Sequence, residues 1–325
     1  MSNLKKSDRI YIAGHRGLVG QSIMASLLSR GYQNVLTRDR ETLDLVDQAA
    51  VRDFLASERP DVVFVAAARV GGILANDRKG ADFIHDNLAI SHNVIWGSHL
   101  AGVRRLVFLG SSCAYPRECP QPIKESSLLN GPLEPTNRPY AVAKIAGMEM
   151  VHSLRRQYQR DYFSVMPTNL FGPGDNFHPQ DSHVIPGIIR KILTAKQNGA
   201  NKVTLWGTGK PRREFLFAPD CGDAIVHLCE KIAPDFFESN EYPAPGHSHI
   251  NVGTGEDVSI KDLAEMVAQA AGYQGKVEFD TNMPDGTPVK RLDTGLLSST
   301  GWKYRTSLES GLQQTLKWLE KNPLT

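Results

Sequence analysis

A short stretch near the N-terminus limits the possible folds more than any other part of the chain. Residues 10–12 are apolar and predict a buried strand, residues 21–30 have helical periodicity, and a glycine loop joins the two. The loop has the spacing G-x-x-G-x-x-G, with its glycines at Gly14, Gly17 and Gly20. Such a loop lets the backbone approach a pyrophosphate, which the N-terminus of the helix then faces. A tight turn without a ligand is the alternative, but strand, spacing and helix together favour a phosphate site.

The rest of the first half alternates between strands and helices. Apolar runs typical of buried parallel strands lie at residues 34–37, 61–66 and 105–109. Helical patterns lie between and after them, at residues 48–57, 81–100 and 140–158. This order predicts the α/β fold class, with a Rossmann-type doubly wound parallel sheet.

The second half is less regular and predicts a smaller C-terminal substrate-binding lobe. Prolines and glycines cluster over residues 167–186, a strand is expected at 203–206, and an amphipathic helix at 260–271. A helix around residues 219–232 is expected to return to the first lobe. We therefore expect a cofactor domain and a substrate lobe, formed by residues 1–172 with about 216–252 and by residues 173–215 with 253–325.

Composition argues against several classes of protein. The 325 residues carry a formal net charge of +2, which gives no general attraction to nucleic acid or membranes. No apolar run approaches the ~20 residues that span a bilayer, and residues 1–9 lack the apolar core of a signal peptide. The cysteines have no metal-binding or CxxC spacing, at Cys113, Cys119, Cys221 and Cys229. We expect no metal site, reduced thiols in a cytoplasmic protein, and Cys221 and Cys229 as buried apolar side chains.

Charged residues after the second predicted strand bear on the choice of dinucleotide. An acid there bonds the ribose 2′-hydroxyl of NAD, whereas arginine accommodates the 2′-phosphate of NADP. The sequence has Arg38, Asp39 and Arg40 at this point, and Arg16 lies inside the glycine loop. The guanidinium groups favour NADP. Arg38 and Arg40 could instead point into solvent, and Asp39 keeps NAD open.

Tyr140 and Lys144 are four residues apart in a predicted helix, so they share one face, roughly 5–6 Å apart at Cβ. An ammonium beside a phenol is expected to lower the phenol's pKa, which lets the phenol exchange a proton with a carbonyl or alcohol. An exposed helical pair is the ordinary alternative. Ser111 and Ser112 follow a buried strand at the edge where such sheets bind ligands, so a serine could bond the same oxygen.

The glycine loop, the strand-end serines and the Y-x-x-x-K pair together resemble the extended short-chain dehydrogenase/reductase family. Segments that resemble its GDP-L-fucose synthases in particular lie at residues 68–73, 110–116, 133–137, 166–173 and 175–179. The likeness spans nearly the whole chain. It implies an enzyme that converts GDP-4-dehydro-6-deoxy-D-mannose to GDP-L-fucose, by epimerisation at C3 and C5 and then NADPH-dependent reduction at C4.

The resemblance also implies the roles of catalytic residues. Cys113 and His183 match the acid/base pair of epimerisation, in which a 4-keto group acidifies the protons at C3 and C5. Tyr140 would give a proton to the C4 oxygen, Lys144 would support it, and Ser111 would orient that oxygen. Without the resemblance, Cys113 reads as a packed thiol and His183 as a structural histidine.

The remaining site residues are carried over in the same way. Residues implied to contact NADP are Gly14, His15, Arg16, Gly17, Leu18, Val19, Gly20, Arg40, Leu109, Gly110, Ser111, Ser112, Tyr140, Lys144, Pro167, Thr168, Asn169, Leu170 and His183. Residues implied to contact the GDP-sugar are Asn137, Asn169, Lys191, Trp206, Arg213 and Lys290.

Three of the substrate residues have a plain alternative. Asn137 and Asn169 would look the same in the sequence if their amides capped loops. Lys191 stands where some family members carry arginine, so the charge is kept but the bidentate fork is lost. A surface lysine on a helix explains Lys191 equally well, and Arg190 is adjacent.

Three other functions are compatible with the same fold. A related 4,6-dehydratase usually carries Thr-Asp-Glu where this chain has Ser112, Cys113 and Ala114, and a 4-epimerase would need no special cysteine. A non-catalytic NADP sensor on the same fold would tolerate loss of Tyr140 and Lys144, and both are present. The family resemblance further implies a homodimer, through the helices expected at 81–100 and 140–158.

Overall fold

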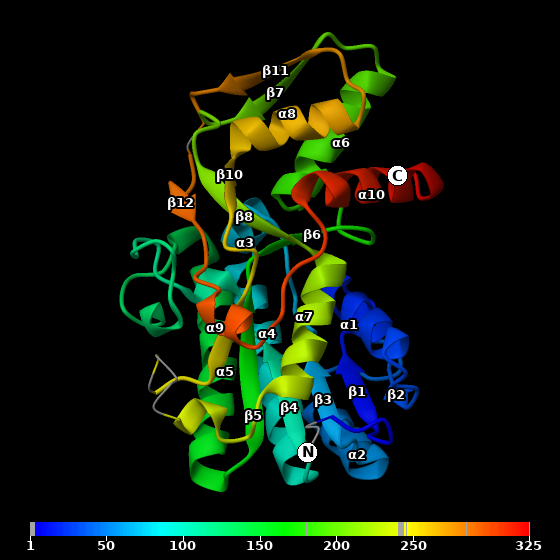
Figure 1. The fold of residues 1–325 in the computed structure, drawn as a ribbon, viewed down its shortest axis with the longest axis vertical. Helices are drawn as coiled ribbons and strands as arrows, with labels where there is room; N and C mark the ends of the chain where they lie inside the picture. The colour runs from blue at the N-terminus through cyan, green and yellow to red at the C-terminus, as the bar shows by residue number, and fades with distance from the viewer. Residues whose placement is uncertain (1–3, 180, 240–243, 245, 284, 325) are drawn as a thin grey trace.

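The computed structural model describes residues 4–179, 181–239, 244, 246–283 and 285–324. A six-stranded parallel sheet in the order β2-β1-β3-β4-β5-β9 forms the centre of the larger lobe (Figure 1). Its strands are β1 (Ile10–Ala13), β2 (Val35–Leu36), β3 (Val62–Val65), β4 (Arg105–Leu109), β5 (Asp161–Pro167) and β9 (His249–Val252). The expected Rossmann-type doubly wound sheet is therefore confirmed.

Helices cover both faces of this sheet, so most of its strands are buried along their whole length. One face packs on α1 (Leu18–Ser29) and α7 (Ala218–Lys231), where Cys221 and Cys229 are buried as expected. The other face packs on α2 (Gln48–Glu58), α4 (Gly80–Leu100) and α5 (Arg138–Tyr158). Strands buried on both faces explain why their sequences are continuously apolar rather than alternating.

The smaller lobe lies above the carboxyl ends of the central strands (Figure 1). Its central strand β8 (Arg212–Phe217) pairs with three others, which are β6 (Asn169–Phe171), β10 (Asp257–Ser259) and β12 (Val289–Lys290). A second pair of strands is formed by β7 (Lys202–Trp206) and β11 (Lys276–Asp280). The lobe's helices are α6 (Val184–Gln197), α8 (Ile260–Ala270) and α10 (Leu308–Lys321), which share one apolar core.

The remaining helical elements are short. They are α3 (Ile73–Arg78), α9 (Gly295–Ser299) and the 3₁₀ turns Ser112–Ala114, Glu125–Ser127, Pro135–Asn137 and Phe236–Glu238. Leu297 of α9 and Trp302 pack in the core of the larger lobe, although they lie late in the chain. Strand β6, which directly follows β5, pairs with β8 of the smaller lobe.

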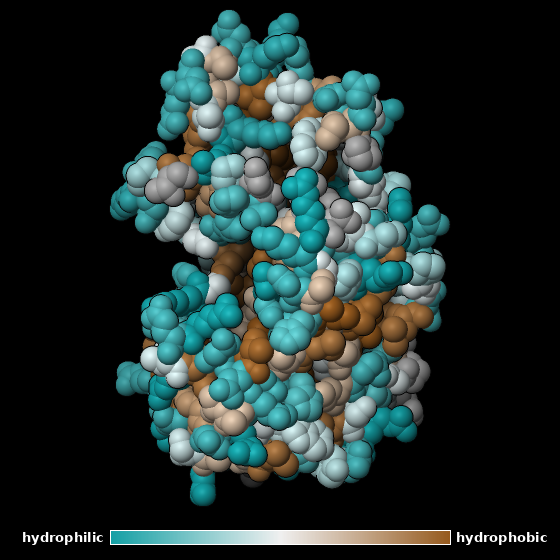
Figure 2. Space-filling view, turned by 180° about the vertical axis from the view of Figure 1, so that it is seen from behind, coloured by the Kyte–Doolittle hydropathy of each residue, from teal (hydrophilic) through white to brown (hydrophobic). Residues whose placement is uncertain are grey.

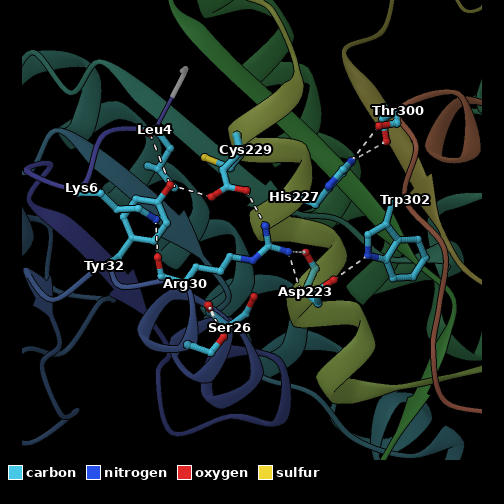
Figure 3. A network of polar contacts seen from close by, with 12 residues as sticks. Leu4, Lys6, Ser26, Arg30, Tyr32, Asp223, His227, Cys229, Thr300 and Trp302 are labelled. Carbon is cyan, nitrogen blue, oxygen red and sulfur yellow. Dashed lines mark hydrogen bonds and ion pairs between the residues drawn. The ribbon is translucent and has the colours of Figure 1, made fainter. Parts of the chain in front are cut away.

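A polar network joins α1, α7 and the segment after α9 (Figure 3). Arg30, at the end of α1, forms ion pairs with Asp223 and Glu230 of α7. The other carboxylate oxygen of Asp223 accepts a hydrogen bond of 2.9 Å from the Trp302 indole. Burial raises the pKa of Asp223, but the hydrogen bonds from Arg30 and Trp302 lower it more, so that its pKa lies below the ordinary value.

We predict that Asp223→Asn lowers the free energy of unfolding by about 1–3 kcal/mol at pH 7, because Arg30 loses one of its two ion-pair partners inside the network. A carboxyl with a lowered folded-state pKa stabilises above its unfolded value of about 3.9, and this contribution is lost as the pH falls through the folded-state pKa. The gap between variant and wild type should therefore close toward pH 3. Urea denaturation at several pH values measures it.

The matched control is Glu265→Gln, which removes a carboxylate from the exposed face of α8. It should leave the urea midpoint unchanged. A gap for Asp223→Asn that is as large at pH 3 as at pH 7 would contradict the ion-pair explanation.

Candidate active site

The glycine loop joins β1 to α1 as predicted and leaves a cradle of backbone. Gly14 has a φ of +86°, and a Cβ there would lie 2.5 Å from the backbone nitrogen of Ala67. A Cβ on Gly20 would lie 2.1 Å from the carbonyl oxygen of Gly14. Glycine is therefore required at both places, for the turn and for the close approach of α1 to the loop.

The first turn of α1 has the properties of an anion site. Its N-cap, Gly17, offers no side chain, and the first turn holds no acidic residue. The backbone N–H groups of Leu18, Val19 and Gly20 are thus left for an outside acceptor, and the positive end of the helix dipole favours an anion. These residues fit the pyrophosphate of a dinucleotide cofactor.

The charged residues after β2 have partners. Arg16 and His15 of the glycine loop both contact the carboxylate of Asp39. Arg38 pairs with Glu58 of α2 rather than pointing freely into solvent, and Arg40 is exposed beside Asp44. This edge of the sheet therefore carries both the acid and the cations that the sequence suggested.

Tyr140 and Lys144 lie on one face of α5 at the carboxyl edge of the sheet, as their spacing predicts. The ammonium of Lys144 is 5.9 Å from the centre of the Tyr140 ring and donates a 2.7 Å hydrogen bond to the carbonyl oxygen of Leu109. Ser111 forms a hydrogen bond with the Tyr140 hydroxyl. The reductive group that the sequence predicts is therefore assembled by the fold.

The pKa of Tyr140 is shifted in the direction opposite to the sequence-based expectation, which was a lowered pKa. Burial and the nearby sulfur of Cys113 raise the pKa of the phenol, and the hydrogen bond from Ser111 lowers it by less. Burial also lowers the pKa of Lys144 to about 7, so the ammonium gives the phenol less support than an exposed lysine would. Tyr140 is consequently a neutral phenol, which is the form that donates a proton.

Cys113 stands where the two lobes meet. It follows β4 in a 3₁₀ turn, and its backbone N–H contacts the Ser111 hydroxyl at 3.3 Å. The Nζ of Lys290, on β12 of the smaller lobe, lies 3.7 Å from its sulfur. Arg213 is the neighbour of Lys290 across the β8–β12 pair, and the charge of Cys113 acts on its pKa. Two cations from one lobe thus face a thiol from the other.

His183 is the N-cap residue of α6, but its side chain makes no capping hydrogen bond. The residue is exposed, yet the protein atoms around the ring lower its pKa by desolvation, so the imidazole is neutral at pH 7. The preceding loop is held by a 3.0 Å bond from the Gly72 N–H to the carbonyl of Asp181. Among the described residues, no hydrogen bond or ion pair joins His183 to Cys113 or Tyr140.

The two asparagines have different surroundings. Asn137 precedes α5 without capping it, and its buried amide oxygen has no hydrogen-bond partner in the described part of the chain. That oxygen, three residues from Tyr140, is left for a ligand. Asn169 instead donates a 2.8 Å hydrogen bond to the carbonyl oxygen of Glu214, which Thr168 also contacts. The amide of Asn169 therefore helps hold β6 against β8.

Trp206 and Lys191 form the outer end of the site region, on β7 and α6. Trp206 is 56% exposed, although large aromatic side chains are normally buried. Lys191 lies 5.6 Å from the centre of its ring and contacts the carbonyl of Thr204 at 3.3 Å. Desolvation of its ammonium lowers the pKa of Lys191. The pair offers a flat apolar face and a charge on the same surface.

A hollow separates the lobes in the space-filling view (Figure 2). The sequence did not single out Glu214, a fully buried residue of β8. Its buried carboxylate accepts hydrogen bonds from the backbone N–H groups of Thr254, Gly255 and Leu292. Glu214 thereby fixes Arg213, its neighbour, and Lys290, two residues before Leu292. An acid beside an arginine looks like an exposed pair in a sequence, and only the fold reveals its burial.

Two further properties of the described part of the chain concern other kinds of site. No three histidine, cysteine, aspartate or glutamate side chains within it are grouped as metal ligands would be. Across the same residues, every helix is too short or too polar to cross a membrane.

The chain was compared with known proteins. The model of the NAD dependent epimerase/dehydratase family matches residues 10–252. The GDP-L-fucose synthase of Escherichia coli (strain K12) is 50% identical over 315 residues, which cover 97% of each chain. The GDP-L-fucose synthase of Sinorhizobium fredii is 46% identical and covers 98% of each chain.

A solved structure gives the same picture at the level of the fold. It is a GDP-mannoheptose C4 reductase from Campylobacter jejuni, determined with NADP bound. Its sequence is 35% identical, its TM-score is 0.88, and the match covers 98% of this chain and 99% of that one. The chain therefore belongs to the NAD dependent epimerase/dehydratase family and, within its extended short-chain dehydrogenase/reductase branch, to the GDP-L-fucose synthases.

Proposed function

We propose that this protein converts GDP-4-dehydro-6-deoxy-D-mannose to GDP-L-fucose, by epimerisation at C3 and C5 followed by reduction at C4 with NADPH. The observation that supports the proposal most directly is that the groups expected to serve reduction and epimerisation lie close together. The phenol expected to serve reduction, Tyr140, is close enough to the thiol expected to serve epimerisation, Cys113, for the sulfur to raise its pKa. A single bound sugar could meet both groups without leaving.

The domain assignment follows from this proposal. Residues 1–172 with about 216–252 would hold NADP, and residues 173–215 with 253–325 would hold the nucleotide sugar. The glycine cradle and the first turn of α1 support the first part of this assignment. The cations and the exposed indole of the smaller lobe support the second.

Arg213 is suited to hold the diphosphate of the substrate. Its Nη1 donates hydrogen bonds to the carbonyl oxygens of Thr287 and Arg212, at 2.5 Å and 2.8 Å, which fixes the guanidinium plane. Burial lowers the pKa of Arg213, so an arriving dianion would compensate a charge that the protein leaves poorly solvated. Lys191 and Trp206 would extend this contact toward the nucleotide.

Epimerisation would use Cys113 and His183. The 4-keto group acidifies the protons at C3 and C5, and the sulfur of Cys113 would take such a proton. Lys290, 3.7 Å away, would compensate the negative charge of the sulfur. His183 would take up a proton from solvent and give it to the other face, because an imidazole whose pKa is lowered by desolvation readily gives up an added proton.

Reduction would use Tyr140, with Ser111 and Lys144. When bound, NADPH supplies the hydride that C4 receives. The hydroxyl of Tyr140 would give its proton to the C4 oxygen, which Ser111 would hold by a second hydrogen bond. The buried phenol keeps its proton at neutral pH, and so the donor form is ready. Lys144, fixed by Leu109, would stabilise the phenolate that remains.

The proposed function predicts a specific product. Incubation of the protein with GDP-4-dehydro-6-deoxy-D-mannose and NADPH should yield GDP-L-fucose, identified by NMR from the configuration at C3, C4 and C5. Reduction at C4 without inversion at C3 and C5 would instead indicate another reductase of the family. No turnover of the sugar under conditions where NADPH binds would support a non-catalytic sensor.

Cys113→Ser and Tyr140→Phe should impair opposite halves of the reaction. Without NADPH, the wild type should incorporate solvent deuterium at C3 and C5 of the sugar. We expect Cys113→Ser to slow this exchange by about 10²–10⁴-fold. Tyr140→Phe should leave the exchange rate unchanged, but with NADPH it should slow formation of the reduced product by about 10²–10⁴-fold. Mass spectrometry measures the exchange. Each variant controls for the folding of the other, and exchange at the wild-type rate in Cys113→Ser would refute the role of its thiol.

We further propose that the protein works in the cytoplasm as a homodimer. Four free cysteines support a reducing compartment, and cell fractionation would test it. Exposed apolar side chains support an interface on α4 and α5, at Leu88, Leu100, Val142 and Tyr158. Hydrophobic residues also gather over the larger lobe when the molecule is seen from behind (Figure 2).

If α4 and α5 form the interface, Leu100→Asp should break it, because the carboxylate would be buried against the second copy. Light scattering should then give the mass of one chain, 35.9 kDa, where the wild type gives twice that mass. Leu28→Asp is the matched control, since Leu28 is 52% exposed on α1. A wild type of 35.9 kDa would contradict the dimer.

A further inference from the structure

The carboxylate of Asp39 is bound by two residues of the glycine loop. One of its oxygens lies 2.7 Å from an Nη atom of Arg16, and the other lies 3.2 Å from Nε2 of His15. The side chain of Arg16 is 69% exposed, and its guanidinium donates the hydrogen bond to Asp39. His15 is mostly buried, and its other ring nitrogen has no hydrogen-bond partner among the residues that the structure describes.

The backbone holds Asp39 in this position. Its carbonyl oxygen accepts hydrogen bonds from the N–H groups of Thr42 and Leu43, at 3.0 Å and 2.9 Å. The hydroxyl of Thr42 adds a third bond of 2.9 Å. All three go to the main chain, so the side chain can be changed without removing the turn that follows β2.

The other arginines of this edge also have acidic partners. Arg38 pairs with Glu58 and lies over the ring of Phe54, 5.1 Å from its centre. Arg40 lies 3.5 Å from Asp44. A 2′-phosphate arriving here would therefore compete with a carboxylate for each guanidinium, and Asp39 is the carboxylate joined to the glycine loop itself.

An acid at the end of the second strand has a known chemical consequence. It accepts a hydrogen bond from the ribose 2′-hydroxyl of NAD and repels the 2′-phosphate of NADP. Asp39 lies at this place, 19 residues after the last glycine of the loop, counted from Gly20. The carboxylate of Asp39 could accept the 2′-hydroxyl of NAD. The same carboxylate already contacts Arg16 and His15, which the 2′-phosphate of NADP would need.

We propose that Asp39 sets the cofactor preference of this protein, by holding Arg16 and His15 away from a 2′-phosphate and by accepting the 2′-hydroxyl of NAD. The inference rests on the proposed use of NADPH and deepens it. The wild-type enzyme then discriminates less between the two dinucleotides than a chain with the same arginines and no acid. NADP binds by displacing Asp39 from Arg16, so its affinity depends on salt more steeply than that of NAD.

Calorimetric titration of the cofactor-free protein tests the proposal without any turnover. Adenosine 2′,5′-bisphosphate and AMP differ only by the 2′-phosphate, and NADP⁺ and NAD⁺ form the parallel pair. Asp39→Asn should lower the dissociation constants of the bisphosphate and of NADP⁺ by about fivefold. A change of this size is the effect of a modest exposed charge pair. The binding of AMP and of NAD⁺ should both weaken slightly, because the acceptor of their shared 2′-hydroxyl has lost its charge.

Two other variants make the result specific. Glu41→Gln removes an equal charge from an exposed residue of the same turn and should leave the ratio of the two affinities unchanged. Arg16→Gln should weaken the bisphosphate and not AMP. The proposal is overturned if Asp39→Asn leaves the ratio unchanged, or if Glu41→Gln shifts it equally, since the effect would then be long-range charge.

The outcomes also separate this proposal from the proposed function. If Asp39→Asn has an unchanged affinity ratio but the protein still forms GDP-L-fucose, only the role of Asp39 is lost. If the wild type binds neither NADP⁺ nor the bisphosphate, the cofactor assignment itself fails, and the role of Asp39 fails with it.

Discussion

The buried carboxylate of Glu214 is the contact on which the arrangement of the site depends. It accepts three backbone N–H groups, two from the turn after β9 and one from Leu292 after β12. Desolvation raises its pKa, and the hydrogen bonds lower it by less, so the group is costly to bury and well satisfied once buried. A strand of the smaller lobe is thereby joined to the end of a strand of the larger lobe. Gly253 leaves room for the carboxylate, because a Cβ there would lie 2.1 Å from its oxygen.

This contact explains how one site can combine groups from both lobes. The larger lobe contributes Cys113, Tyr140 and Lys144, at the carboxyl edge of its parallel sheet, where such folds bind ligands. The smaller lobe contributes cations on neighbouring strands, Arg213 on β8 and Lys290 on β12. Neither set is complete alone. The thiol of Cys113 meets an ammonium only because β12 lies in register beside β8 over the end of β4.

Much of the larger lobe could be predicted from the sequence, because parallel strands and their covering helices have strong local patterns. The strand–loop–helix around the glycines and the shared helix face of Tyr140 and Lys144 were predictable for the same reason. The smaller lobe was not predicted in detail, since β12 has only two residues and α6 carries Pro186 in its first turn. A proline is tolerated there, but it hides the helix in a region rich in proline and glycine. The predicted direction of the Tyr140 pKa shift was wrong, because the depth of burial depends on contacts from distant segments.

The shortness of β12 has a consequence for how the site opens. A two-residue strand has few hydrogen bonds to lose, so it separates from the sheet at a lower free-energy cost than the six-residue β8 beside it. Lys290 therefore lies on a locally unstable edge, while Leu292, two residues later, is anchored by Glu214. Local fraying of β12 would uncover the thiol without parting the lobes, and amide hydrogen exchange should be faster at Lys290 than at Leu292. The ammonium beside Cys113 thus lies on a short strand whose C-terminal side is anchored by the hydrogen bond between Leu292 and Glu214.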